Sequence, residues 1–320
     1  MQEAKINEII ETVIRDLIAS GSVSNFHAAP NVTPAVQTSQ TFNAATTPAP
    51  TSDIKRSNQS VSIDLPDPTS AELRFKSRVI NPKDPTAINE LIRSTSARIG
   101  VGRAGVRYNT ASLLLFQGDH AVTQDALYRE IDQGLLDEFN LFTVQTNISE
   151  GKEQFLLRPD LGRQLNGEAK RTLSEKCIKN PNIQLVIGDG LSTTAIEANL
   201  RQIFPILKQG FAASGLTLGT PFYVKYCRVG VINDIGDVIK PDVLILLIGE
   251  RPGLGRADSM SAYMGYRPKN GNNDADRDVI CNIFENGGTN PLEAGAFIVQ
   301  VAQKMIHYQA SGVKLKLVTK

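Results

Sequence analysis

The chain has 320 residues, a formal net charge of +1 and 21% charged residues, so its charge gives no support to a protein that binds nucleic acid or an anionic membrane surface. Its three cysteines and three histidines show no metal-ligand spacing and no CxxC pair, which argues against a metal site and is typical of a protein from a reducing compartment. The sequence has neither a signal peptide nor an apolar run long enough to cross a membrane, so we expect a cytoplasmic protein.

Residues 1–20 have the pattern of an amphipathic helix. Apolar residues recur there at a spacing of three or four, with charged residues on the opposite face. Residues 21–60 predict a flexible, disordered linker, because Ser22 to Ser52 contain no charged residue and are rich in alanine, threonine and proline. A helix this short is marginal in water. It therefore either docks on another protein or folds back on the core.

Residues 61–158 predict a mainly helical domain. Pro85 begins one helix, and another is expected over Thr110 to Gln117 and then His120 to Ile131. Between them, Gly100–Gly105 matches the G-x-G-x-x-G pattern of dinucleotide-binding loops. Such a loop needs a strand before its first glycine, and here a helix end precedes it. Two interpretations stay open, a tight turn between domains and a stand-alone nucleotide-binding protein such as an NAD-dependent dehydrogenase.

Residues 159–320 alternate between helix and strand patterns. A helix is expected from Pro159, with Leu161, Leu165 and Ala169 on one side. Three apolar runs predict buried strands, and they are separated by helical patterns: 182–187, 222–226 and 243–248. This order indicates a βαβαβ unit. The fold class is therefore α/β (α+β overall), with a Rossmann-like parallel-sheet domain after the helical one. A further strand at 279–284 and a final helix at 291–309, with Phe297, Val301 and Met305 facing inward, complete it.

Polar groups follow each of the three buried strands. The loops are Asp189–Ser192, Cys227–Val229 and Glu250–Gly253. Because the carboxyl ends of parallel strands meet at one edge, where open α/β sheets bind ligands, we expect a ligand site there. The sequence offers Ser192 as a nucleophile, and Asp189 with Glu250 as paired carboxylates, but no complete catalytic motif. The residues favour a ligand-binding domain over a self-sufficient enzyme.

Several of these segments resemble, in order and spacing, the small subunit of ethanolamine ammonia-lyase. The likeness covers about residues 85 to 312, and its most specific blocks are LVIGDGLSTTAI and ILLIGERPGLGRADSMSAY. The resemblance implies an adenosylcobalamin-dependent lyase that splits ethanolamine into acetaldehyde and ammonia. It also implies a TIM-barrel large subunit that holds the substrate, in a hexamer of heterodimers, and a small subunit that is inactive alone. The glycine motif is then a coincidence, and the dehydrogenase is the alternative.

The resemblance also implies which residues contact the cobalamin. The family's valine after Tyr-x-Arg falls on Val229, and its glutamate in GERPGL falls on Glu250. The usual cysteine contact falls on Val279, with Cys281 two places later. Weaker candidates are Asp189, Ser192, Arg228, Arg251 and Cys281. Extensions like residues 1–20 resemble signals that direct this enzyme into a bacterial microcompartment, so a shell or cargo protein is the expected partner of that helix.

Overall fold

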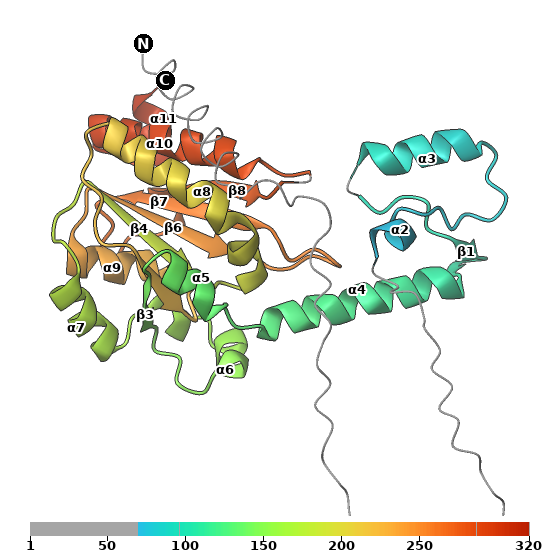
Figure 1. The fold of residues 1–320 in the computed structure, drawn as a ribbon, viewed down its shortest axis with the longest axis horizontal. Coiled ribbons are helices and arrows are strands. Elements are labelled where there is room, and N and C mark those ends of the chain that lie inside the picture. Colours follow the sequence, from blue (N-terminus) through green and yellow to red (C-terminus); the bar gives the residue numbers. More distant parts are fainter. Residues whose placement is uncertain (1–69, 96, 286, 320) are drawn as a thin grey trace, which may run out of the picture.

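The computed structural model describes residues 70–95, 97–285 and 287–319, and it shows a mixed α/β fold (Figure 1). A mixed six-stranded sheet lies between two helical layers. An arm made of residues 70–128, without residue 96, projects from one side. The α/β class expected from the sequence is confirmed. The helix expected at 1–20 and the linker at 21–60 lie outside the described residues. Within the described part of the chain, no helix is long and apolar enough to cross a membrane.

The strands of the sheet lie in the order β3-β5-β4-β6-β7-β8. The neighbours β3, β5, β4 and β6 pair in parallel, whereas β7 is antiparallel to both β6 and β8. The strand bounds are β3 (Phe142–Gln145), β4 (Ile183–Gly188), β5 (Phe222–Lys225), β6 (Val243–Gly249), β7 (Met260–Tyr266) and β8 (Arg277–Ile283). The unit β4–α8–β5–α9–β6 is the expected βαβαβ unit, in which α8 spans Thr193–Ala213 and α9 spans Val231–Ile239.

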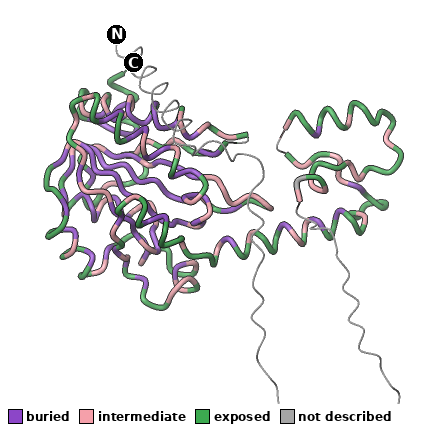
Figure 2. The backbone as a smooth tube through the Cα atoms, in the orientation of Figure 1, coloured by how far each residue is buried: buried purple, intermediate pink, exposed green. Residues whose placement is uncertain are grey.

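Helices cover both faces of the parallel strands, which explains why these strands are apolar at nearly every position. Every residue of β4 and β6 is buried. One face, with Leu185 and Ile245, packs in a cluster with α8 and α10 (Pro291–Tyr308). The other, with Val186 and Leu246, packs with α7 (Gly167–Lys176) and α9. Figure 2 shows the buried residues, in purple, concentrated in the sheet between these helices.

The sheet begins earlier in the chain than the sequence pattern indicated. β3 and α5 (Gln133–Glu138) both precede residue 159, yet β3 pairs with β5, and Leu135 and Leu136 lie in the main core. A four-residue strand gives too short a pattern to be recognised in isolation. The remaining short elements of this part are α6 (Lys152–Leu157), η1 (Leu161–Arg163), η2 (Asp274–Asp276) and α11 (Val313–Val318).

Two local expectations are wrong. No regular helix begins at Pro159, because Leu161–Arg163 form a single 3-10 turn and α7 begins only after Asn166, whose side chain accepts a hydrogen bond from Ala169 N. The helix expected between 110 and 131 is present as α4 (Thr110–Tyr128). Phe297 on α10 is 51% exposed and does not pack inward, whereas Met305 is buried as expected.

The glycine motif does not form a dinucleotide-binding loop. Gly100–Gly105 follow α3 (Pro85–Ser94), not a strand, and lead into a hairpin of β1 (Arg103–Ala104) and β2 (Arg107–Tyr108). A side chain at Gly102 would place its Cβ 2.1 Å from the Arg78 carbonyl oxygen, so this glycine is needed for close packing of the arm. The structure therefore gives the nucleotide-binding interpretation no support.

The arm is joined to the sheet by a buried ionic cluster. Asp119 of α4 is fully buried and pairs with two arginines. One is Arg98, and the other is Arg74, the last residue of α2 (Ala71–Arg74), at 2.9 Å. Arg74 also donates to the Gly255 carbonyl oxygen at 2.8 Å, and Thr123 donates to that of Gly253 at 2.8 Å. The loop between β6 and β7 is thereby held against α4.

Candidate functional site

The three loops expected to share the carboxyl edge of the sheet do lie together. Leu191 N donates to the Gly249 carbonyl oxygen at 3.0 Å, and the Asp189 carboxylate accepts hydrogen bonds of 2.7 Å from Tyr226 N and Cys227 N. The backbones of β4 and β6 approach closely at this edge, since a Cβ on Gly249 would stand 1.9 Å from the Ser192 carbonyl oxygen. The place between β4 and β6, where an α/β sheet can hold a dinucleotide, is thus filled by the protein's own backbone.

Asp189 is a structural anchor of this edge. Its carboxylate is fully buried, and the Lys152 ammonium group lies 3.6 Å away. Burial raises the pKa of Asp189, and the nearby Lys152 and the backbone N–H donors oppose that rise. By binding Tyr226 N and Cys227 N, the carboxylate fixes the loop that presents Val229. Asp189 and Glu250 bond different neighbours, so the structure does not bring them together as paired carboxylates.

The other weaker candidates also have structural partners or point to solvent. The Ser192 hydroxyl is buried, accepts from Ala195 N at the start of α8 and donates to the Ala257 carbonyl oxygen at 2.5 Å, which does not fit a nucleophile. Arg228 donates to the Phe155 carbonyl oxygen at 3.1 Å and lies over the Phe155 ring. Arg251 is exposed.

The three main candidates lie on one side of the sheet, and Tyr263 is paired with two of them. Tyr263 stands directly opposite Val279 in the pairing of β7 with β8, and its hydroxyl donates to Glu250 Oε1 at 3.2 Å. Val229, just before α9, and Tyr263 both pack against the apolar cluster on the α7–α9 face of the sheet. Tertiary structure therefore links three segments that are far apart in the sequence.

We call the outer part of this side of the sheet the β7–β8 face. It consists of Tyr263, Val279 and Cys281 with the adjacent Glu250. Val279 is 49% exposed and Cys281 is also exposed, whereas α10 covers the opposite side, where Ile283 is fully buried. Cys281 is next to a β-bulge at Asn282, whose φ is 57°. This face therefore presents an exposed valine beside a tyrosine and a carboxylate that accepts a hydrogen bond.

Tyr263 is the residue of this face that the sequence did not identify. Its pKa is raised from 10.0 to about 12 by burial and then by the negative charge and hydrogen bond of Glu250. The only signal in the sequence was its position in the apolar stretch after GERPGLG, which does not distinguish a core tyrosine from a surface one.

Replacement of Glu250 by glutamine is expected to lower the pKa of Tyr263 from about 12 toward 10.0, because the neighbouring negative charge is removed while the ring stays in place. Titration of ring-labelled tyrosine by NMR measures this, with Tyr263→Phe to assign the signal. The pKa of Tyr263 is higher in the folded chain than in the unfolded chain. Its contribution to the free energy of unfolding is therefore fully present below pH 10 and is lost as the pH rises through 12. An unchanged pKa in Glu250→Gln, as expected for the exposed control Glu175→Gln, would show that burial alone shifts Tyr263.

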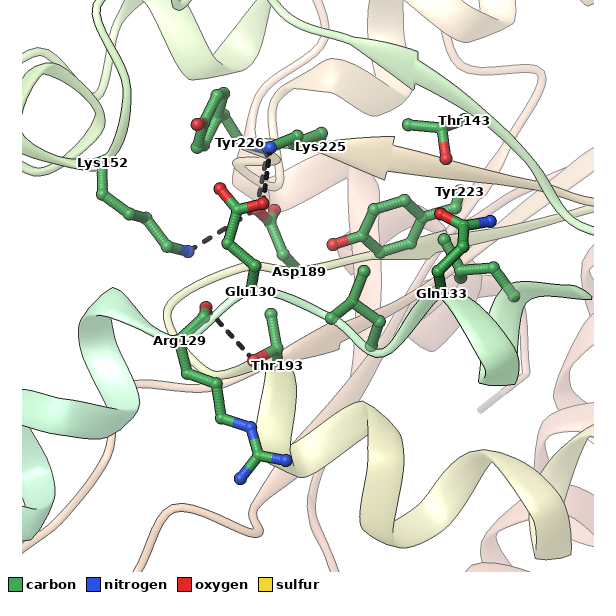
Figure 3. A pocket seen from close by; sticks show the side chains of 12 residues that line it. Arg129, Glu130, Gln133, Thr143, Lys152, Asp189, Thr193, Tyr223, Lys225 and Tyr226 are labelled. Carbon is green, nitrogen blue, oxygen red and sulfur yellow. Dashed lines mark hydrogen bonds and ion pairs between the residues drawn. The ribbon is translucent and has the colours of Figure 1, made fainter. Parts of the chain in front are cut away.

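A cavity of about 230 Å³ lies at the same edge, beside β3, β5 and β4 (Figure 3). Asp189 forms part of its wall, but Val229, Glu250 and Val279 are not among the residues that line it. The β7–β8 face and this edge cavity are thus two separate features. Asp189 connects them, because it supports the loop before α9 from the cavity side.

Comparison with known proteins identifies a family that most of this chain resembles. The family described as ethanolamine ammonia-lyase light chain (EutC) matches residues 85–316. A relative from Clostridium perfringens, named ethanolamine ammonia-lyase small subunit, is 43% identical over 252 residues, which are 79% of this chain and 85% of the relative. Relatives of the same name from Clostridium tetani and Clostridioides difficile are 44% and 42% identical, again over 79% of this chain and 85% of their own lengths.

Proposed function

The chain belongs to the family of ethanolamine ammonia-lyase light chains, and we propose that it is the small subunit of an adenosylcobalamin-dependent enzyme that splits ethanolamine into acetaldehyde and ammonia. The observation that carries this proposal is the family match over residues 85–316, which includes every segment of the β7–β8 face. In this proposal the α/β part is a Rossmann-like domain that closes over the cofactor at the interface with a larger subunit.

The β7–β8 face fits a cobalamin. A corrin is a broad ring with apolar faces and a border of amide groups. Val279, 49% exposed, and the half-buried Val229 offer apolar contacts for such a ring. Glu250 offers a carboxylate that accepts hydrogen bonds from amide N–H groups, and the Tyr263 hydroxyl holds that carboxylate in position. Cys281, on the same exposed strand, takes no required part in this arrangement.

The cofactor, when bound, supplies the radical chemistry of the reaction. The residues of this chain hold and orient it and shield one side from water. We propose that the large subunit is a TIM barrel that binds ethanolamine, and that six heterodimers form the complex. Apolar side chains on the projecting arm support a contact with a partner: Val106 is 90% exposed, Leu114 55% and Leu113 45%.

Reconstitution tests the proposal. The chain alone is expected to release no acetaldehyde from ethanolamine, whereas the chain together with its large subunit and adenosylcobalamin is expected to restore release, measured with a coupled alcohol dehydrogenase assay. Activity of the large subunit alone at the same level would contradict a need for this chain. Oxidation or reduction of a nicotinamide cofactor by the isolated chain would favour a dehydrogenase instead.

We also propose that residues 1–20, which lie outside the described residues, direct the complex into a bacterial microcompartment through a shell or cargo protein. Deletion of residues 1–20 is expected to leave acetaldehyde release by the reconstituted complex unchanged and to abolish its co-sedimentation with shells. The double substitution Ile10→Asp with Ile14→Asp should have the same effect, because it breaks the apolar stripe at constant length. Truncated protein that still enters shells would place the signal elsewhere, for example on the large subunit.

A further inference from the structure

The edge cavity lies at the carboxyl ends of three parallel strands, β3, β5 and β4. Its wall is completed by the segment that joins α4 to α5 and by Lys152 at the start of α6. Its volume is about 230 Å³, below the roughly 300–1,000 Å³ of pockets that hold drug-sized ligands. A ligand of this cavity must therefore be a compact molecule with few non-hydrogen atoms.

Lys152 is the charged group of this cavity with hydrogen bonds still to make. Its side chain is 9% exposed, its Nζ lies 3.6 Å from Asp189 Oδ2, and it forms no hydrogen bond within the described residues. Figure 3 shows the side chain reaching from α6 toward Asp189. An ammonium group has three donors, and a buried donor without an acceptor is costly. An oxygen atom of a ligand in the cavity would supply the acceptor that Lys152 Nζ lacks.

The other charged groups of the lining are already paired. Lys225 Nζ lies 2.8 Å from Glu130 Oε2. The guanidinium of Arg129 turns away from the cavity, as Figure 3 shows, and lies 2.7 Å from Glu197. Asp189 uses its two oxygens for the N–H groups of the β5 loop. With Arg129 paired to Glu197, the other two basic side chains of the lining face the two acidic ones, and only Lys152 among these described side chains lacks a hydrogen-bond acceptor.

A neutral donor stands opposite Lys152. Tyr223 is buried to 2% exposure, and its ring lines the cavity. Burial, with the nearby negative charges of Asp189 and others, raises the pKa of Tyr223 well above its usual value, so the hydroxyl stays protonated at neutral pH. A phenol that keeps its proton can donate a hydrogen bond to an oxygen of a ligand.

We propose that the edge cavity is a second small-molecule site, separate from the β7–β8 face, that binds a compact carboxylate through the Lys152 ammonium group and the Tyr223 hydroxyl. A carboxylate offers the acceptor oxygens that the buried Lys152 ammonium group lacks, and it can have the small size that the cavity allows. A phosphate monoester carries up to two charges at neutral pH and would place more negative charge beside Asp189 than a carboxylate does. The proposal does not depend on cobalamin or on the large subunit.

Isothermal titration of the full-length chain with sodium acetate and sodium glycolate tests this site, with sodium chloride at equal ionic strength as the baseline and inorganic phosphate as a competing anion. Saturable binding of one of the carboxylates is expected, and Lys152→Met should weaken it by about tenfold or more, since a charge-assisted hydrogen bond is lost. Lys208→Met, an exposed lysine on α8, is the matched control and should bind like the original chain.

Tyr223→Phe keeps every charge and the ring, and it should weaken carboxylate binding several-fold without unfolding the chain. This variant keeps the test decisive if Lys152→Met fails to fold, which near-ultraviolet circular dichroism would reveal. The proposal is overturned by the absence of saturable binding to either carboxylate, by phosphate binding more tightly than both, or by unchanged affinity in Tyr223→Phe. None of these results involves the cofactor, so the proposed lyase function can stand or fail independently.

Discussion

Asp189→Ala is expected to lower the free energy of unfolding by about 3–5 kcal/mol, the largest effect of any single substitution considered for this chain. The change removes the acceptor of two buried N–H groups, Tyr226 N and Cys227 N, each bonded at 2.7 Å. It also leaves the 9%-exposed Lys152 side chain without its counter-charge. Urea unfolding followed by far-ultraviolet circular dichroism measures the loss.

Asp160→Ala is the matched control for Asp189→Ala. Asp160 also pairs with a basic residue, Arg158 at 2.7 Å, but both side chains are more than half exposed. Its removal should change stability little, because exposed ion pairs contribute little. Asp189→Asn should lie between the two, because its amide oxygen replaces one acceptor only. Similar unfolding curves for Asp189→Ala and Asp160→Ala would show that the β5 loop does not depend on the buried carboxylate.

Glu250→Ala is expected to weaken retention of cobalamin by the assembled complex by about 1–3 kcal/mol, or roughly fivefold to 150-fold in affinity. The carboxylate proposed to accept hydrogen bonds from the corrin amides is lost, and the Tyr263 hydroxyl is left without its partner. Titration of the complex with cobalamin, followed by visible absorbance, measures the affinity. Thermal unfolding of this chain should change little, because Glu250 is half-buried just beyond the end of β6.

Glu175→Ala provides the comparison for Glu250→Ala, since Glu175 is an exposed glutamate of α7. It should retain cobalamin normally. Unchanged cobalamin affinity in Glu250→Ala, together with a large fall in melting temperature, would mean that Glu250 serves the fold and not the cofactor. Loss of cobalamin in Tyr263→Phe with Glu250 intact would instead assign the contact to the tyrosine hydroxyl itself.

Apolar periodicity predicted the central strands because strands buried on both faces need apolar residues at almost every position. β4 and β6 are buried at every position, and their runs stand out in the sequence. The same reasoning failed for Phe297, which is 51% exposed, because one aromatic residue on a helix does not show which side faces the core. At Gly100–Gly105 the sequence already showed a helix end before the first glycine, and the structure has a hairpin there without a preceding strand.

Sequence blocks also placed the candidate site at Val229, Glu250 and Val279, but they did not show how these residues meet. Tyr263 joins two of them, by its register opposite Val279 and its hydrogen bond to Glu250. Strand register depends on pairing between segments and not on the pattern within one segment. For this reason the tyrosine was missed, although it lies within a block that resembles the family.

The sequence by itself determined the α/β class, the βαβαβ order, the family and the edge at which polar loops gather, because each of these depends on local patterns along the chain. Only the tertiary structure decided which polar groups are anchors and which face open space. It placed Asp189 under the β5 loop, Asp119 between Arg74 and Arg98, and Lys152 beside a cavity. Burial and pairing set these roles, and both arise from contacts between residues that no periodicity relates.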